Sequence, residues 1–308
     1  MSGKTVRLFA VCVLLMAGGL RASAETTEPT ETVTVTANKL REIFHKFAKT
    51  FAAPTKIGGK IARWERPICP VVMGQNPHFT AFIAQRIKYI ALAAGAPFDP
   101  APSCTPNIEI VFTTAPQALM DNVRQHTVDY LGFAETNAQR DKLAMVTRPI
   151  QAWYATESND ANGRRRLDNG EWSLQNINGD IVFVPPIYAS TGGHINNGII
   201  SGFNHILIVI DSTKLEGQKI VPLADYISML ALTQLSSLDA CQQLQPSIVN
   251  MLAADCDHGT DGLTEFDLAY LQGLYHMTAG RALMFQRNDI ADVMAEKLMG
   301  WPIRIGRQ

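Results

Sequence analysis

The chain has 308 residues, of which 46% are hydrophobic and 18% are charged, and its formal net charge is −1. This length and composition predict a folded chain with a substantial core and exclude a disordered one. The balanced charge argues against a nucleic-acid partner, because phosphate recognition needs an excess of Lys and Arg. The one basic run, Arg164–Arg166, lies among Asn, Asp and Gly and is expected on a solvated loop.

The first residues have the pattern of a secretory signal peptide. Lys4 and Arg7 precede an apolar run that ends at Leu20, and the small residues Ala22–Ala24 follow. A signal peptidase reads such small residues, so we expect cleavage near Ala24 and removal of residues 1–24. No later stretch reaches the roughly 20 apolar residues of a membrane span. The mature chain is therefore expected to be soluble, without a transmembrane span, and either periplasmic or secreted.

Cysteine usage agrees with export. Once Cys12 leaves with the signal peptide, the remaining cysteines are Cys69, Cys104, Cys241 and Cys256. An even number in an oxidising compartment predicts two disulfides. Of the possible pairings we favour Cys69 with Cys104 and Cys241 with Cys256, because each pair lies within one half of the chain.

The first half of the chain reads as alternating helices and strands. Residues 25–40 are rich in Thr and Glu and are expected to form a flexible leader before a single domain at 41–308. Apolar residues at helical spacing and in alternation then predict elements in this order: a helix at 40–51, a strand at 63–74, a helix from Pro77 that ends at Gly95, a strand at 107–114 and a helix at 116–126. Pro67 and Pro70 place the first strand at a sheet edge.

The second half begins with strands and ends in helices. Strands are expected at 148–157, 179–186 and 205–212, with a polar connector at 158–172 and a Gly/Asn loop at 190–204. The strand at 205–212 is apolar throughout, so it is predicted to be buried on both faces. Helices are expected at 221–235, 245–252, 264–275 and 288–301, the first with one buried stripe. The pattern predicts an α+β fold, a mixed sheet with packed helices.

The helix at 264–275 carries the most specific local signals. Thr264 can cap it and Asp267 fills the reciprocal position of a capping box. Together with the buried strand and the helix at 221–235, this layout resembles metzincin-type zinc peptidases, and implies a zincin-like C-terminal part. Over most of residues 60–300 the chain also resembles a group of uncharacterised exported proteins of proteobacteria, which carry strings like "DYISMLAL" and "LTEFDLAYLQGLY".

The zinc-binding residues of that peptidase family are not found in this chain. Its His-Glu-x-x-His-x-x-Gly-x-x-His pattern, placed on the helix at 221–235, puts Ala224, Ser228 and Gln234 at the ligand positions and Asp225 at the base. Zinc needs imidazole nitrogens there, and these side chains are no substitute. We therefore expect no metal, no cofactor and, on balance, no catalysis. A faint calcium-loop pattern after Asp257 lacks its final Glu.

Three functional hypotheses remain. The first is a non-catalytic module that binds an envelope protein or a small ligand in a vestigial cleft, formed by His194, Asn204, His205, Asp225 and Ser228. The second is a hydrolase with an atypical site around His194, His205 and Asp211. The third is a structural envelope protein without a small-molecule site.

Overall fold

The computed structural model describes residues 37–99, 103–160, 164–169, 173–177, 180–184, 198–215, 217–236, 238, 241, 246–253, 256 and 260–300, without the side chains of 37, 38 and 173–184. The predicted signal peptide, residues 25–36 of the predicted leader, and His194 lie outside these residues. In the part of the chain that is described, no helix is both long and apolar enough to cross a membrane.

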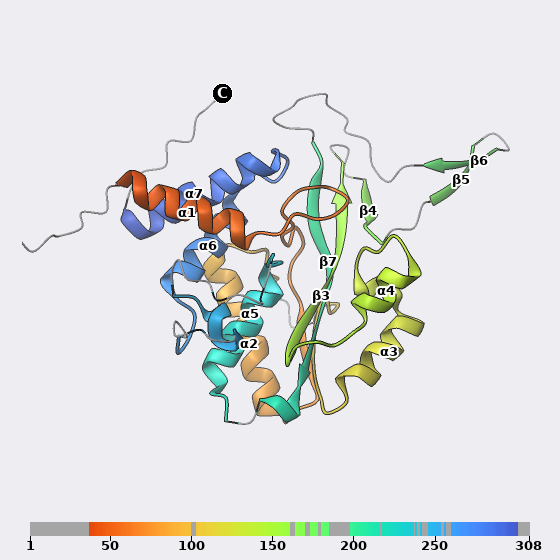
Figure 1. Ribbon diagram of the computed structural model, residues 1–308, viewed down its shortest axis with the longest axis horizontal. Coiled ribbons are helices and arrows are strands. Elements are labelled where there is room, and N and C mark those ends of the chain that lie inside the picture. The colour runs from red at the N-terminus through yellow and green to blue at the C-terminus, as the bar shows by residue number, and fades with distance from the viewer. Residues whose placement is uncertain are drawn as a thin grey trace, which may run out of the picture. The chain divides into compact units, whose positions relative to one another are not determined.

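A mixed sheet forms the centre of the fold (Figure 1). In spatial order its strands are β1 (Pro70–Met73), β2 (Ile108–Thr113), β7 (Ile200–Asp211), β3 (Ile150–Asn159) and β4 (Arg165–Leu167). β1, β2 and β7 run parallel, whereas β3 is antiparallel to β7 and β4 is antiparallel to β3. β7 is central, as its apolar sequence predicted, and β1 is an edge strand, as its prolines predicted. A separate hairpin consists of β5 (Ser173–Ile177) and β6 (Asp180–Val184).

Helices cover both faces of this sheet, and their combination with a mixed parallel and antiparallel sheet confirms the predicted α+β class. One face carries α1 (Ala37–Phe51), α2 (Pro77–Ala94), α5 (Ile220–Leu232), α6 (Glu265–His276) and α7 (Leu283–Met299). The other face carries α3 (Pro116–His126), the 3-10 helix η1 (Val128–Leu131) and α4 (Asn137–Leu143). Two short 3-10 helices, η2 (Ser212–Lys214) and η3 (Ile248–Leu252), complete the described elements. The larger core lies under the first group and a smaller one, around Trp153 and Leu207, lies under the second.

Helix α5 is buried on all sides rather than along one stripe. Every residue from Pro222 to Leu232 is buried, so its polar side chains must find partners within the protein. Aromatic side chains donate hydrogen bonds to the carbonyls at its C-terminal end: Tyr154 to Leu230 and Thr233 (3.1 and 3.2 Å), Trp64 to Ala231 (2.8 Å) and Tyr275 to Leu232 (2.8 Å). The last carbonyls of a helix have no partner within it, so these bonds fix the end of α5 against the sheet.

The predicted capping box at the start of α6 is confirmed. The Thr264 side chain accepts from the Asp267 amide, and the Asp267 carboxylate accepts from the Thr264 amide. The same carboxylate also accepts from the Ser247 hydroxyl and, at 2.9 Å, from the Ile248 amide. Asp267 therefore joins η3 to α6 as well as capping the helix.

Both expected disulfides are present. Cys69 pairs with Cys104 across 35 residues, and Cys241 pairs with Cys256 across 15. The favoured pairing is thus confirmed, and such covalent bonds fit an extracytoplasmic location.

Some boundaries differ from prediction. β7 begins at Ile200, so 200–204 is strand and not loop, with a bulge opposite Ala155 and Thr156 that leaves Asn204 without a register partner. α1 begins at Ala37, within the expected leader, and the polar connector contains β4.

Candidate functional site

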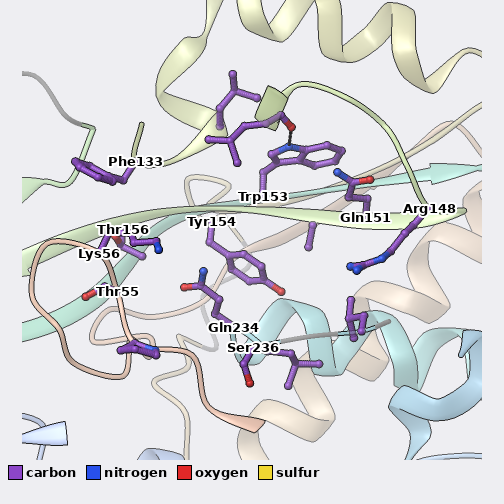
Figure 2. A pocket seen from close by; sticks show the side chains of 16 residues that line it. Thr55, Lys56, Phe133, Arg148, Gln151, Trp153, Tyr154, Thr156, Gln234 and Ser236 are labelled. Atoms are coloured by element: carbon purple, nitrogen blue, oxygen red, sulfur yellow. Dashed lines mark hydrogen bonds between the residues drawn. The ribbon is translucent and has the colours of Figure 1, made fainter. Parts of the chain in front are cut away.

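A cleft runs along the outer edge of β3, and we call it the β3 cleft. It comprises two adjoining hollows of about 340 and 690 Å³ that share the β3 residues Gln151, Ala152 and Trp153. The remaining described walls are the loop Pro54–Lys56, the segment from Leu131 through α4 to Arg148, and the segment Gln234–Leu238 after α5. Figure 2 shows β3 crossing this space, with Trp153 and Tyr154 projecting to opposite sides of the strand.

β3 presents unpaired backbone to this cleft. Among the described residues, β4 pairs only with Glu157–Asn159, so the stretch before it has a strand neighbour on one side only. The Pro149 carbonyl bonds to Asp211 of β7, whereas the Thr156 carbonyl bonds to Asp168 on the other side. The N–H and C=O of one residue point to the same side of a strand and the side alternates along the chain, so those of Ile150, Ala152 and Tyr154 point outward.

Gly132 marks the end of the open edge. Its φ is +80°, and a Cβ there would come within 2.3 Å of the Tyr154 carbonyl oxygen. Only glycine therefore fits this close approach. Of the β3 backbone groups, those without a partner among the described residues are the groups of Ile150 and Ala152, with the N–H of Tyr154.

Side chains of β3 hold the walls of the cleft in place. Trp153 donates from Nε1 to the Leu143 carbonyl at 2.7 Å, which fixes the end of α4 over the strand. Gln151 accepts from the Thr147 amide at 2.8 Å and donates to the Met145 carbonyl at 3.0 Å. Below the strand, the Tyr154 hydroxyl is bound to the end of α5, and burial raises its pKa, so it stays protonated. The cleft is thus a preformed feature.

Gln234 forms part of the opposite wall. It lines the cleft beside Tyr154 (Figure 2), and its Oε1 is buried without a hydrogen-bond partner among the described residues. A buried amide oxygen without a partner is unusual in a folded protein. A ligand N–H that reached this oxygen would satisfy it, which is a gain in free energy.

The predicted binding residues on α5 do not face a cleft. Asp225 is fully buried and accepts a bidentate pair from Arg86 (2.5 and 3.0 Å) and a bond from the Leu263 amide (2.8 Å). The hydrogen bonds that Arg86 donates to Asp225 raise the pKa of Arg86. Ser228 is also fully buried and donates to the Ala224 carbonyl at 2.7 Å. Asp225 therefore joins α2, α5 and the segment before α6, whereas the Ser228 hydroxyl is satisfied within α5 itself.

His205 occupies a buried position on the opposite face of the sheet. Its side chain is 8% exposed, its ring stacks on Tyr130 at 3.8 Å, and its Nε2 lies 3.3 Å from Glu109 Oε1. That approach is not aligned as a hydrogen bond, and neither ring nitrogen has a hydrogen-bond partner among the described residues. Burial lowers the pKa of His205, against the opposing influence of Glu109. Asn204 accepts from Arg66 at 2.7 Å.

The structure separates the two described residues of the alternative hydrolase. His205 and Asp211 lie on the same strand, six residues apart, which corresponds to about 20 Å. Asp211 instead accepts from the Thr213 amide at the start of η2 and lies 3.4 Å from Lys214. Within the described ranges there is no group of His, Cys, Asp or Glu that could hold a metal ion, and His194 and His258 lie outside them.

The β3 cleft was not identified from the sequence. Its walls come from segments far apart in the chain, and whether a strand is at an edge depends on its neighbours. The available signal was the strand "IQAWYAT", which has a large aromatic on each face and was correctly predicted as a strand. Comparison with family models, curated proteins and solved structures found no match to this chain.

Proposed function

We propose that this chain binds an extended polypeptide segment that adds a strand to β3 within the β3 cleft. The observation that carries the proposal is the open edge of β3, which forms one side of a cleft. In strand addition, backbone hydrogen bonds supply affinity and pockets for alternate side chains supply specificity. The outward N–H and C=O of Ala152 and the N–H of Tyr154 provide these backbone hydrogen bonds.

The two hollows provide the pockets for alternate side chains of the added strand. Side chains of an added strand alternate between the two sides of the sheet, as those of β3 do. One set would lie near Trp153 and Leu143, and the other near Leu235 and Leu238. Gln234 faces the bound segment from the far wall.

We propose further that the module is exported and non-catalytic, with a zincin-like layout. The disulfides and the N-terminal pattern of the sequence support export, with signal-peptide cleavage near Ala24. The order of buried β7, α5 and capped α6 supports the layout. At the aligned peptidase positions, Asp225 is bound to Arg86 and Ser228 to the Ala224 carbonyl, which supports a role without the zinc chemistry of that family.

A proline in the edge strand tests the proposal. The probes are labelled peptides of about ten residues that alternate Val with Gln, Glu or Lys, with binding followed by fluorescence anisotropy. Ala152→Pro removes an outward N–H that β7 does not use. We expect it to weaken binding of any peptide that binds by about tenfold, the equivalent of one or two hydrogen bonds.

Val72→Pro is the matched control. The Cys69 carbonyl bonds toward β2, so alternation turns the Val72 amide outward at the opposite edge of the sheet. This variant should bind the peptides as the unaltered chain does. Failure of all the peptides to bind, or equal binding by Ala152→Pro, would overturn the proposal.

A further inference from the structure

The β3 cleft is positively charged although the chain is not. Among its described lining residues, the charged ones are Lys56, Lys142, Arg148 and Glu135. Three cations and one carboxylate face this space, in a chain whose formal net charge is −1. The excess of positive charge in the β3 cleft therefore does not follow from the composition of the whole chain.

The cations come from separate segments and surround the strand. Lys56 follows α1 and lines both hollows, Lys142 is on α4, and Arg148 precedes β3. In Figure 2, Lys56 lies beside Thr156 and Arg148 lies toward the other end of the strand. A segment bound along β3 would thus pass cations at both ends.

Two of these cations are open to a ligand. Lys56 and Lys142 are exposed, and neither forms an ion pair with any residue that the structure describes. Lys214 and Lys219, in contrast, lie within 3.4 and 2.9 Å of Asp211 and Asp261. Carboxylates of a bound segment are the natural partners, because complementary charge raises the association rate and selects among competing segments.

We propose that the segment bound by the β3 cleft is acidic, an extended stretch of a partner polypeptide in which Asp or Glu alternates with apolar residues. This inference rests on the proposed function and specifies its ligand class. The apolar side chains occupy the hollows beside Trp153 and Leu235, and the carboxylates lie near Lys56, Lys142 and Arg148.

The three probe peptides separate charge from backbone binding. At low salt, the peptide that alternates Val with Glu should bind about tenfold more tightly than its Gln counterpart, and the Lys peptide more weakly than both. A few-fold gain per exposed ion pair accounts for that difference. High salt should reduce it, because screening weakens interactions between exposed charges.

Peptide binding by a charge-reversal variant of the cleft is the second test. The double variant Lys56→Glu and Lys142→Glu should lose the preference for the Glu peptide while it still binds the Gln peptide. Lys297→Glu is the matched control, because Lys297 is exposed on α7 and does not line the cleft. It should retain the preference of the unaltered chain.

The outcomes distinguish this inference from the function on which it rests. Equal binding of all the peptides, or a preference for Lys, would overturn the acidic ligand and leave strand addition standing. A preference for Glu that the double variant retains would also overturn it. Failure of every peptide to bind would overturn the proposed function itself.

Discussion

Asp225 is a charged residue in a buried helix, and hydrogen bonds from its neighbours compensate for its burial. Its carboxylate holds Arg86 of α2 and the amide of Leu263 ahead of α6, so one side chain joins three segments. The Arg86 side chain is 30% exposed, which moderates the cost of burying this pair.

Removal of that carboxylate should destabilise the fold without acting on the cleft. We expect Asp225→Ala to lower the free energy of unfolding by about 3 kcal/mol, because it leaves Arg86 and a buried amide without a partner. Urea denaturation measures this loss. Asp292→Ala, which breaks a 3.7 Å surface pair with Arg41, should cost less than about 1 kcal/mol. Equal losses would contradict the packing role.

His205 should make stability depend on pH. Burial lowers its pKa below the value of an exposed histidine, about 6.5, so the unfolded chain binds a proton more readily than the folded one. Its stabilising contribution is therefore complete above about pH 6.5 and is lost as the pH falls toward the lowered folded pKa.

The measurement compares unfolding free energies of the unaltered chain and His205→Gln as the pH is lowered from about 8 to 5. The unaltered chain should lose more stability, with an excess slope below about 1.4 kcal/mol per pH unit for a single proton. The difference isolates His205 from other titrating groups, such as Asp168, whose pKa burial raises. Parallel pH curves for the two proteins would contradict the assignment.

Residue-scale predictions from the sequence identified polar positions but not their surroundings. Asp225 and Ser228 lie in a helix whose spacing suggested one buried stripe, yet the aromatic donors around its end and α2 on its flank bury every side. Whether a carboxylate faces a ligand or an arginine from another helix depends on packing across 139 residues of chain. Local sequence patterns do not predict contacts between residues that far apart in the chain.

At the scale of elements, the strength of local signals decided what could be predicted. α2 begins after Asn76, which caps it, and ends at Gly95 with φ +82°, and α6 has its capping box. Such signals lie within a few residues of one another. The short strands β4 and β5 depend instead on their pairing partners, and neither was predicted.

The attachment of β3 to α5 yields an element-scale prediction. Tyr154→Phe removes the hydroxyl that binds the Leu230 and Thr233 carbonyls and should lower the free energy of unfolding by about 1 to 2 kcal/mol. Calorimetry or denaturation measures the loss. Tyr275→Phe, which frees the Leu232 carbonyl away from the cleft, is the matched control for stability.

Peptide binding separates the two tyrosines from the strand edge. Both variants should bind the probe peptides within about twofold of the unaltered chain, since the Ala152 backbone groups are unchanged. A large loss of binding in Tyr154→Phe alone would show that its hydroxyl contacts the ligand, contrary to its burial under the strand.

For the molecule as a whole, the disulfides connect stability to compartment. Loop-closure entropy assigns about 3 kcal/mol to the 15-residue loop and about 4 kcal/mol to the 35-residue loop. Cys69→Ala with Cys104→Ala should therefore lower the unfolding midpoint more than Cys241→Ala with Cys256→Ala, and reductant should lower that of the unaltered chain. An unfolding midpoint unchanged by reductant would contradict a stabilising role for these bonds.

The fold class followed from apolar periodicity along the sequence. The disulfide pairing followed from an even cysteine count and from the position of each pair within one half of the chain. The β3 cleft did not, because it exists only once α4, the loop after α1 and the end of α5 meet along one strand. Its cations illustrate the point, since Lys56, Lys142 and Arg148 are dispersed in the chain and converge only in the folded molecule.

The central claim is that a partner segment pairs with the open edge of β3, and residue-resolved amide hydrogen exchange tests it most directly. On addition of the Glu peptide, the amides of Ala152 and Tyr154 should become protected, while those of Gln151 and Trp153, which point toward β7, should stay as they were. Protection that misses Ala152 and Tyr154, or that appears instead around Asp225 and Ser228, would contradict the account.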